Sequence, residues 1–291
     1  MARLDRSNPD NAPGEWFVDT RCIDCDTCRQ VAPAVFADHR GLSVVAAQPL
    51  DAGNVTAAWR ASLACPTSSI GTRDVHRRPP DRLFPQELAD GVYYCGYNHE
   101  DSFGANAFLA VRPAGNVLVD SPRYTRRLLG PITELGGIDH VVLTHRDDVA
   151  DAQRWADHFG ARVWVHTADA GAAPFATDVV EGTDVVMVQP GLVLVPIPGH
   201  TQGSVAFVLE DRYLFSGDSL YWDRDDNDLA AHRQATWYSW AEQTRSLARL
   251  AETCSFEWVL AGHGDREHRP AEEMHARLVA LTRRMAAPLQ P

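Results

Sequence analysis

Four positions in the second half of the chain follow one pattern, in which an apolar run ends in a small turn and a side chain able to bind a metal comes next. The runs VVLT, LVLVPIPG, YLFSG and EWVLAG lead to His145, His200, Asp218 and His263. In layered α/β folds such positions line up along one edge of the sheet. Three imidazoles and one carboxylate at that edge predict a site for zinc, iron or manganese. A lone histidine after a strand is more often a hydrogen-bonded surface residue, and this interpretation holds for His140, His158 and His166.

A second group of metal-capable side chains lies near the N-terminus. Cys22, Cys25 and Cys28 stand in CIDCDTC, and Cys65 precedes Pro66. Two residues between successive thiolates let one short loop wrap a metal centre. Three such cysteines exceed the single C-x2-C pair of a common zinc knuckle, whereas C-x2-C-x2-C with a distant C-P is the ligand pattern of bacterial ferredoxins. A zinc site or scattered structural thiols is the alternative.

This part of the chain resembles a single-cluster ferredoxin across residues 14–73. EWFVD is its expected first strand, VTAAWRASLA the helix before Cys65, and SSIGTRD the closing strand. In two-cluster ferredoxins, three residues separate the third ligand from a further cysteine. In this chain that position, counted from Cys28, holds Ala32. The resemblance therefore implies one cluster, 4Fe–4S, held by Cys22, Cys25, Cys28 and Cys65. Cys95 and Cys254 stand in apolar surroundings and are predicted to be buried core thiols.

Length and charge exclude several kinds of partner. The chain has 291 residues, 45% of them hydrophobic, which is enough for a full core and two domains. The formal net charge is −12, so neither nucleic acid nor an anionic membrane surface is an expected partner. No apolar run approaches the roughly 20 residues that span a bilayer, and the start of the chain lacks the apolar stretch of a secretory signal. We expect a soluble, cytoplasmic protein.

A stretch rich in arginine and proline divides the chain near residue 80. Pro79, Pro80 and Pro85 disfavour both helix and strand. We therefore expect three parts, which are a ferredoxin-like domain at 1–75, a linker at 76–90 and a second domain at 91–291.

In the second domain, apolar runs alternate with amphipathic stretches. DVADAQRWADHFG is typical of a helix, with Gly160 placed as its C-terminal stop. Strands that alternate with helices predict a layered sheet with helices packed outside it.

The segments PGHTQGS, SGDSL and AGHGD resemble signatures of the metallo-β-lactamase superfamily, and the resemblance covers roughly residues 91–270. It implies an αββα sandwich with two metals at one edge, so the whole chain is expected to be of the α+β class. His200 would bind the first metal, Asp218 would bridge, and His263 would bind the second.

The first motif of this family, T-H-x-H-x-D-H, is altered here. Thr144 and His145 match, but the next three motif positions hold Asp147, Val149 and Ala150. Valine and alanine cannot coordinate a metal, so one iron or zinc ion is expected rather than two, unless another carboxylate swings in, the candidates being Asp148 and Asp151. Asp147 is either an oxygen ligand of the first metal or a cap of the helix that follows.

The lip of the predicted site offers two further groups. The segment after Asp218 contains an acidic run and several large aromatic residues, which either wall a ligand pocket or pack into the core, among them Trp222, Trp237, Tyr238 and Trp240. In a second segment, His99, Glu100 and Asp101 precede a strand and could reach the site.

Three functions remain open. In the first, the cluster serves redox chemistry on a small molecule at the altered metal site, with a redox partner protein as a further expectation. In the second, the second domain is a mononuclear hydrolase of an ester, thioester or lactone, and the cluster is structural or regulatory. In the third, the protein is a non-catalytic electron carrier or binding module. We favour the first, because hydrolysis gives no reason for a ferredoxin module.

Overall fold

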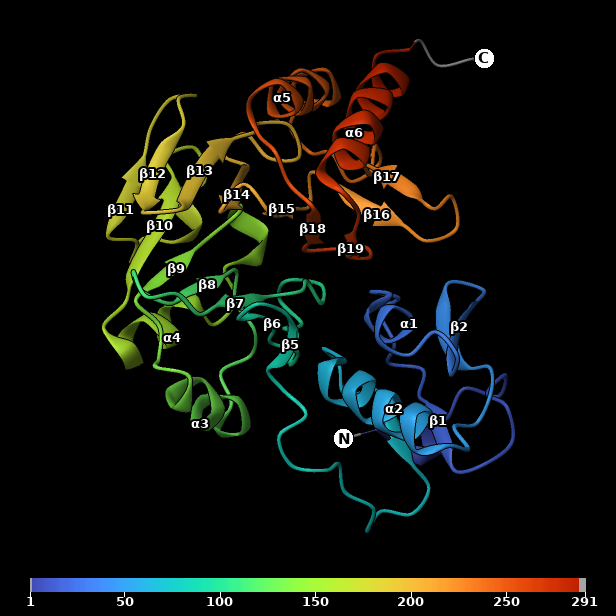
Figure 1. Ribbon diagram of the computed structural model, residues 1–291. Helices are drawn as coiled ribbons and strands as arrows, with labels where there is room; N and C mark the ends of the chain where they lie inside the picture. The colour runs from blue at the N-terminus through green and yellow to red at the C-terminus, as the bar shows by residue number, and fades with distance from the viewer. Residues whose placement is uncertain (1, 288–291) are drawn as a thin grey trace.

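The computed structural model describes residues 2–287, and the chain forms two domains (Figure 1). In the first domain, β1 (Trp16–Val18) pairs with β4 (Ile70–Thr72), and β2 (Phe36–His39) pairs with β3 (Leu42–Val45). The first domain also contains the turn η1 (Leu4–Arg6), the helix α1 (Thr27–Val31) and the helix α2 (Ala52–Ala64). The strands and the helix expected from the ferredoxin resemblance are therefore present.

The second domain is built on two sheets that pack face to face. The first sheet has seven strands in the order β11–β10–β9–β8–β7–β6–β5, and the second has six in the order β12–β13–β14–β15–β18–β19. The strands of the first sheet are β5 (Gln86–Ala89), β6 (Val92–Tyr94), β7 (Phe108–Ala110), β8 (Val117–Val119), β9 (His140–Val142), β10 (Arg162–His166) and β11 (Asp178–Val180). Those of the second are β12 (Val186–Gln189), β13 (Leu192–Pro196), β14 (Val205–Leu209), β15 (Tyr213–Gly217), β18 (Trp258–Ala261) and β19 (Glu267–His268). A separate hairpin joins β16 (Tyr221–Asp223) to β17 (Asp228–Ala230).

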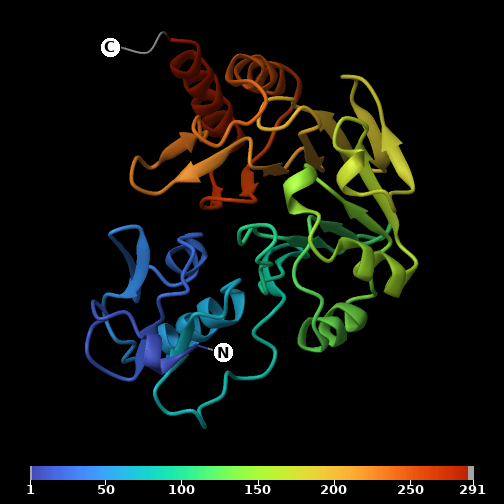
Figure 2. The same ribbon diagram turned by 180° about the vertical axis from the view of Figure 1, so that it is seen from behind.

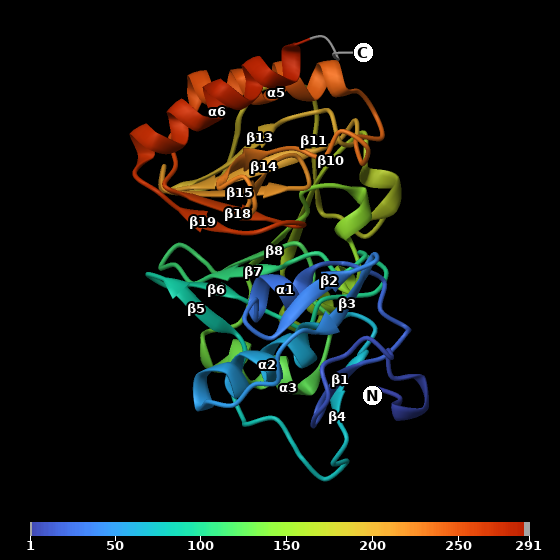
Figure 3. The ribbon, with the colours of Figure 1, turned by 90° about the vertical axis from the view of Figure 1, so that its right-hand side faces the viewer.

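Helices cover the outer face of each sheet, as Figure 3 shows for the second sheet. α3 (Arg126–Glu134) and α4 (Ala152–Phe159) pack on the first sheet, and α5 (Trp240–Thr253) and α6 (Ala271–Ala286) cover the second. Short turns η2 (Arg146–Asp148) and η3 (Ala170–Ala172) complete the fold. The αββα sandwich expected from the sequence is confirmed. None of the helices within residues 2–287 is long and apolar enough to cross a membrane.

Continuous apolar runs form the central strands because these strands are covered on both faces. All five residues of β14 and of β15 are buried, between the first sheet on one side and α5 and α6 on the other. Phe108 on β7 and Phe215 on β15 join the two sheets, with ring centroids 5.7 Å apart. Helix α4 ends where expected, at Gly160 with φ +68°.

The expected linker at 76–90 is shorter in the structure. β5 begins at Gln86 and forms the edge of the first sheet, so the boundary expected at residue 91 is corrected to Gln86. Proline is tolerated beside an edge strand, where no neighbouring strand needs its missing N–H, and Pro85 therefore did not exclude a strand.

The first domain lies beside the β5–β7 end of the first sheet in both Figure 1 and Figure 2. One cluster of buried apolar residues spans the two domains and includes Trp16 and Phe36 of the first and Phe108 and Phe215 of the second. Arg123 donates from Nη2 to the carbonyl of Cys65 at 3.2 Å, and Arg224 donates to Asp26 at 2.5 Å. The two domains therefore pack as one body rather than as two modules on a free tether.

Phe215→Ala is expected to lower the free energy of unfolding by about 3–5 kcal/mol, because it leaves a cavity between the sheets. Denaturant unfolding with Val75→Ala as control tests this, since Val75 is 70% exposed and its truncation should change stability by less than about 0.5 kcal/mol. Equal effects of the two substitutions would contradict the packing described here.

Candidate functional site

The four strand-to-turn positions singled out in the sequence meet at one edge of the sandwich. His145 follows β9, His200 follows β13, Asp218 follows β15 and His263 follows β18. Gly262 is needed there because a Cβ atom at this position would lie 2.6 Å from Asp218 Oδ1 and 3.0 Å from Asp148 Oδ2. The glycine thus makes room for two carboxylates.

Four ligand atoms form a compact set at this edge. His145 Nε2 lies 3.9 Å from Asp147 Oδ2 and 3.6 Å from Asp218 Oδ2, and His200 Nε2 lies 3.6 Å and 3.7 Å from the same two oxygens. A tetrahedral ion with ligands at about 2.0–2.2 Å needs separations of roughly 3.3–3.6 Å. The ligand atoms of His145, Asp147 and His200 lie within 4.8 Å of one another and could bind one ion after a small inward movement, with Asp218 Oδ2 near both imidazoles as a further ligand.

The two imidazoles in this set have the properties of metal ligands. His145 Nε2 and His200 Nε2 are buried, and neither has a hydrogen-bond partner among residues 2–287. Burial lowers the pKa of His145 to about 4, which keeps the ring neutral. Thr144 Oγ1 donates to Asp120 and so can accept from His145 Nδ1, at 3.0 Å. This contact leaves the Nε2 lone pair of His145 facing the carboxylates.

The two interpretations of Asp147 can now be compared. Its Oδ2 faces His145 and His200, and the contact with His200 lowers its pKa. Helix α4 starts after Asp151, whose side chain makes no capping hydrogen bond. The geometry therefore favours Asp147 as a ligand over Asp147 as a cap.

Of the two carboxylates considered as replacements, only Asp148 enters the site. Asp148 is fully buried, its Oδ2 lies 3.8 Å from His145 Nδ1, and within the described chain neither oxygen has a hydrogen-bond partner. It forms a second candidate metal group with His145 and Asp218, whose ligand atoms lie within 4.8 Å of one another. Asp151 instead accepts from the Tyr124 N–H at 2.7 Å.

The site concentrates negative charge that must be compensated. Burial raises the pKa of Asp120 to about 7, and burial beside Asp218 and Asp120 raises the pKa of Asp148 well above its ordinary value. Burial would also raise the pKa of Asp218, but His263, His145 and His200 hold it below its usual range. Protons or a cation must balance these groups.

His263 reaches the edge but turns differently from His145 and His200. Its Nδ1 lies 2.9 Å from each oxygen of Asp218, and its Nε2 lies 3.4 Å from the carbonyl oxygen of Phe103. Burial alone would lower its pKa, but Asp218 raises it. In this arrangement His263 is a hydrogen-bond partner of Asp218.

The cysteines expected to hold a cluster surround one small cavity in the first domain, which all four line: Cys22, Cys25, Cys28 and Cys65. Left-handed backbone at Asp24 (φ +60°) and Asp26 (φ +64°) wraps the CIDCDTC loop around it. Backbone N–H groups of Asp24 and Ser69 point at the sulfurs of Cys22 and Cys65, at 3.4 and 3.3 Å. Burial raises the pKa of Cys25 to about 11, so cluster assembly must displace a proton there. Cys95 is fully buried as expected, and Cys254 is half-buried.

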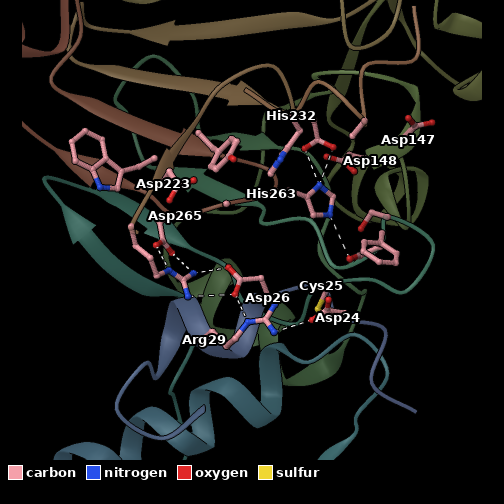
Figure 4. A pocket seen from close by; sticks show the side chains of 18 of the residues that line it. Asp24, Cys25, Asp26, Arg29, Asp147, Asp148, Asp223, His232, His263 and Asp265 are labelled. Carbon is pink, nitrogen blue, oxygen red and sulfur yellow. Dashed lines mark hydrogen bonds and ion pairs between the residues drawn. The ribbon is translucent and has the colours of Figure 1, made fainter. Parts of the chain in front are cut away.

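A cavity of about 1250 Å³ joins the metal edge to the first domain (Figure 4). The edge contributes Asp147, Asp148, His200, Asp218 and His263, and the first domain contributes residues from the cluster loop, including Asp24, Cys25, Asp26 and Arg29. The metal edge and the cluster loop therefore face one cavity.

The lip residues divide between cavity and core. Trp237 and Asp101 line the cavity, whereas Trp240 donates to the Met285 carbonyl beneath α6. Trp222 lines the cavity but is only 3% exposed. Tyr238 is exposed. His99 contacts Asp151 instead, at 3.6 Å.

Three residues of the site escaped the sequence analysis. Asp120 ends the run NVLVD, so the pattern used for the other ligands could have revealed it. Asp169 Oδ2 accepts from the Arg146 N–H and the Thr201 hydroxyl and so holds η2 against the loop of His200. His232 stacks on Tyr221 at 4.0 Å and lines the cavity. No local pattern in the sequence indicates the contacts of Asp169 or of His232.

Two family models match the chain. Residues 18–72 match the 4Fe-4S single cluster domain of Ferredoxin I, and residues 88–282 match the metallo-beta-lactamase superfamily. Hydroxyacylglutathione hydrolase of Acidiphilium cryptum is 29% identical over 119 residues, which are 40% of this chain and 49% of that protein. The match thus spans about half the length of this curated relative.

Solved structures share the fold of the second domain. The metallo-beta-lactamase FIM-1 from Pseudomonas aeruginosa in the mono-zinc form is 18% identical, with 70% of this chain and 96% of that chain covered and a TM-score of 0.53. A metallo beta lactamase from Hirschia baltica is 16% identical, with 68% and 96% covered and a TM-score of 0.50. At these identities the likeness concerns the fold alone.

Anaerobically purified protein is expected to contain about four iron and four sulfide per chain, with one further iron or zinc ion. His200→Ala should remove only the further ion, because it deletes one of the two buried imidazoles of the four-atom set. Metal and sulfide analysis tests this, with His275→Ala on the exposed face of α6 as control. Retention of the further ion in the His200 variant would rule out the four-atom set.

Asp148→Asn is expected to stabilise the metal-free edge by about 1–3 kcal/mol at pH 8, the usual range for a buried unsatisfied polar group. The raised pKa of Asp148 means that the folded protein resists an ionisation that the unfolded chain undergoes near pH 4. The free energy of unfolding of the wild type therefore falls as pH rises above about 4. The difference in this free energy between Asp148→Asn and wild type should shrink as pH is lowered toward that value. Thermal unfolding across pH tests this, with Asp157→Asn on exposed α4 as control. A constant difference across pH would show that Asp148 stays ionised.

Proposed function

This chain belongs to the metallo-beta-lactamase superfamily, and we propose that its second domain is a metal-dependent hydrolase of a small ester or thioester. One observation carries the proposal. Two buried imidazole nitrogens without hydrogen-bond partners in the described chain face two carboxylates across 3.6–3.9 Å. Such an arrangement is costly unless a cation fills it, because buried polar atoms and charges need partners.

His145 and His200 would hold zinc or iron through Nε2, and Asp147 and Asp218 through one oxygen each. With a further ligand position left open for water, the ion would act as a Lewis acid and lower the pKa of that water molecule. Two carboxylates in one ligand set give the ion less net positive charge than the three imidazoles of a common catalytic zinc site would. We therefore expect a weaker Lewis acid than in relatives with an unaltered first motif.

The protein would position the ligands through contacts outside the four-atom set. Asp120 and Thr144 fix the tautomer of His145. Asp169 ties η2, which carries Asp147, to the loop that carries His200. The backbone carbonyl of His200 accepts from the Trp237 N–H at 2.9 Å and so fixes Trp237 at the cavity wall.

The cavity sets the class of substrate. Phe103, Tyr221 and Trp237 supply apolar surface, and Arg146 supplies a cation beside the metal edge. The lining as a whole carries ten aspartates against three arginines, so it suits a small molecule with an apolar part and no large negative charge. The curated relative carries the name of a thioester hydrolase, which supports a thioester as the first class to test.

Redox chemistry on a small molecule is the second candidate. The observation that favours it is that Cys25 of the cluster loop lines the same cavity as His200 and Asp218. A substrate that extended across the cavity from the edge metal would reach this cluster ligand, so the cluster could exchange single electrons with it or with an external redox partner protein.

Turnover of a panel of model esters and thioesters by metal-loaded protein tests the first candidate. Asp147→Ala should lower kcat/KM by about 100-fold, the scale on which loss of metal-site interactions acts. Asp147→His restores an imidazole at this position and should keep the metal and measurable turnover. His275→Ala serves as the unaffected control.

Two outcomes would contradict hydrolysis. One is the absence of turnover on every ester and thioester by protein that retains the edge metal. The other is turnover that persists in Asp147→Ala at the rate of wild type. Substrate conversion that occurs only with a chemical reductant present would favour the redox candidate instead.

A further inference from the structure

The segment Asn98–Asn106, which we call the bridging loop, lies between the cluster loop and the metal edge. Gly104 rests against the cluster loop, with φ +86°. A Cβ atom at position 104 would lie 2.9 Å from Cys25 Cβ, 3.0 Å from Cys25 Sγ and 3.0 Å from Pro66 Cγ. Only glycine lets the backbone come this close to the sulfur of Cys25 and to the residue after Cys65.

Hydrogen bonds from both domains fix Gly104 in place. Its carbonyl accepts from Thr27 Oγ1 at 3.2 Å and from Asn98 Nδ2 at 2.6 Å. Asn106 Nδ2 donates to Gln30 in the first domain at 3.1 Å and to the Ala261 carbonyl at the end of β18 at 3.3 Å. Thr27, Asn98 and Asn106 are all buried, so movement of one domain would break bonds that water cannot readily replace.

The residue before Gly104 reaches the metal edge. The carbonyl oxygen of Phe103 lies 3.4 Å from His263 Nε2, and the two rings are 6.1 Å apart. Phe103 has φ +51°, which is unfavourable for a bulky residue and persists only where surrounding contacts impose it. These contacts include Phe103 N–H to the Glu100 carbonyl and Gly104 N–H to the His99 carbonyl, at 3.0 and 2.9 Å.

The contacts form one continuous series from cluster to metal edge. Cys25 touches Gly104, the Phe103 carbonyl accepts from His263, and His263 Nδ1 meets Asp218 at 2.9 Å. Figure 4 labels Cys25 and His263, two members of this series that face the cavity. The peptide unit between Phe103 and Gly104 thus has a cluster ligand on one side and an imidazole of the metal edge on the other.

We propose that the bridging loop couples the cluster to the metal edge, with Phe103 and Gly104 as positioning residues that make the orientation of His263 depend on the cluster. The proposal rests on the metal site of the proposed function but not on hydrolysis itself. Hydrogen bonds and dipoles near the ligand sulfurs set the potential of a cluster. A cation that binds Asp218 weakens the hydrogen bond between Asp218 and His263. The hydrogen bond from His263 to the Phe103 carbonyl then changes, and with it the polarisation of the peptide unit beside Cys25.

Coupling of this kind is reciprocal, so binding of a metal ion at the edge should change the midpoint potential of the cluster. A divalent ion favours the more negative, reduced cluster, so zinc should raise the midpoint potential. We expect zinc to bind roughly tenfold more tightly to reduced than to oxidised protein, which corresponds to about 59 mV for a one-electron couple.

The experiment is a redox titration of cluster-loaded full-length protein, with the edge first emptied by a chelator and then reloaded with zinc. Phe103→Gly relieves the unfavourable φ and loosens the carbonyl without touching Cys25, and Gly104→Ala presses a methyl group against Cys25. Both should reduce the zinc-dependent shift to less than half of the wild-type value. Gly130→Ala on α3 has open space around the added methyl group and should keep the full shift.

His200→Ala should show no shift, which would prove that zinc acts at the edge. An equal shift in wild type, Phe103→Gly and Gly104→Ala would overturn the proposal, because direct electrostatics between the two sites would then suffice. Should Gly104→Ala fail to hold a cluster, Phe103→Gly alone decides. Loss of hydrolysis with the zinc-dependent shift intact would reject the proposed function and leave the coupling standing.

Discussion

Burial of the Asp218 carboxylate among three imidazoles is the constraint on which the metal edge depends. Its Oδ2 lies 3.6 Å from His145, 3.7 Å from His200 and 2.9 Å from His263. Each histidine stands at the end of a different strand, so the four side chains meet only when both sheets are assembled. The continuous apolar runs of β14 and β15 and the pair Phe108–Phe215 hold the sheets in that register. Packing in the sandwich core thus determines the geometry of a polar site at its rim.

The fused first domain changes what this edge can do. In the sandwich alone, the edge would open to solvent. Here the cluster loop closes one side of the cavity, and the ion pair of Arg224 with Asp26 fastens the hairpin β16–β17 to it. The domains share a continuous core and a buried amide network, so the cluster loop is a fixed wall of the cavity. This arrangement is compatible with a wall for a hydrolytic site, with electron supply, and with the coupling proposed above.

Much of this organisation could be predicted from the sequence because it follows local rules. The spacing of the cysteines and the repeated strand–turn–ligand pattern identified both candidate centres. Spacing could not decide between Asp147, Asp148 and Asp151, because η2 sends the side chains of Asp147 and Asp148 in different directions and Asp151 lies beyond this turn. Asp147 faces the two imidazoles, Asp148 turns into the core beside Gly262, and Asp151 faces Tyr124. The role of Gly104 was equally hidden, since its reason is a contact with Cys25, far away in the chain.

Anomalous X-ray diffraction at the iron and zinc absorption edges, on crystals of anaerobically purified protein, tests the central claim most directly. The account predicts an iron cluster peak among Cys22, Cys25, Cys28 and Cys65. It also predicts one separate peak enclosed by His145, Asp147, His200 and Asp218, with His263 still directed at Phe103. A second-domain peak bound by Asp148 and His263 instead, or an edge without any anomalous signal, would contradict it.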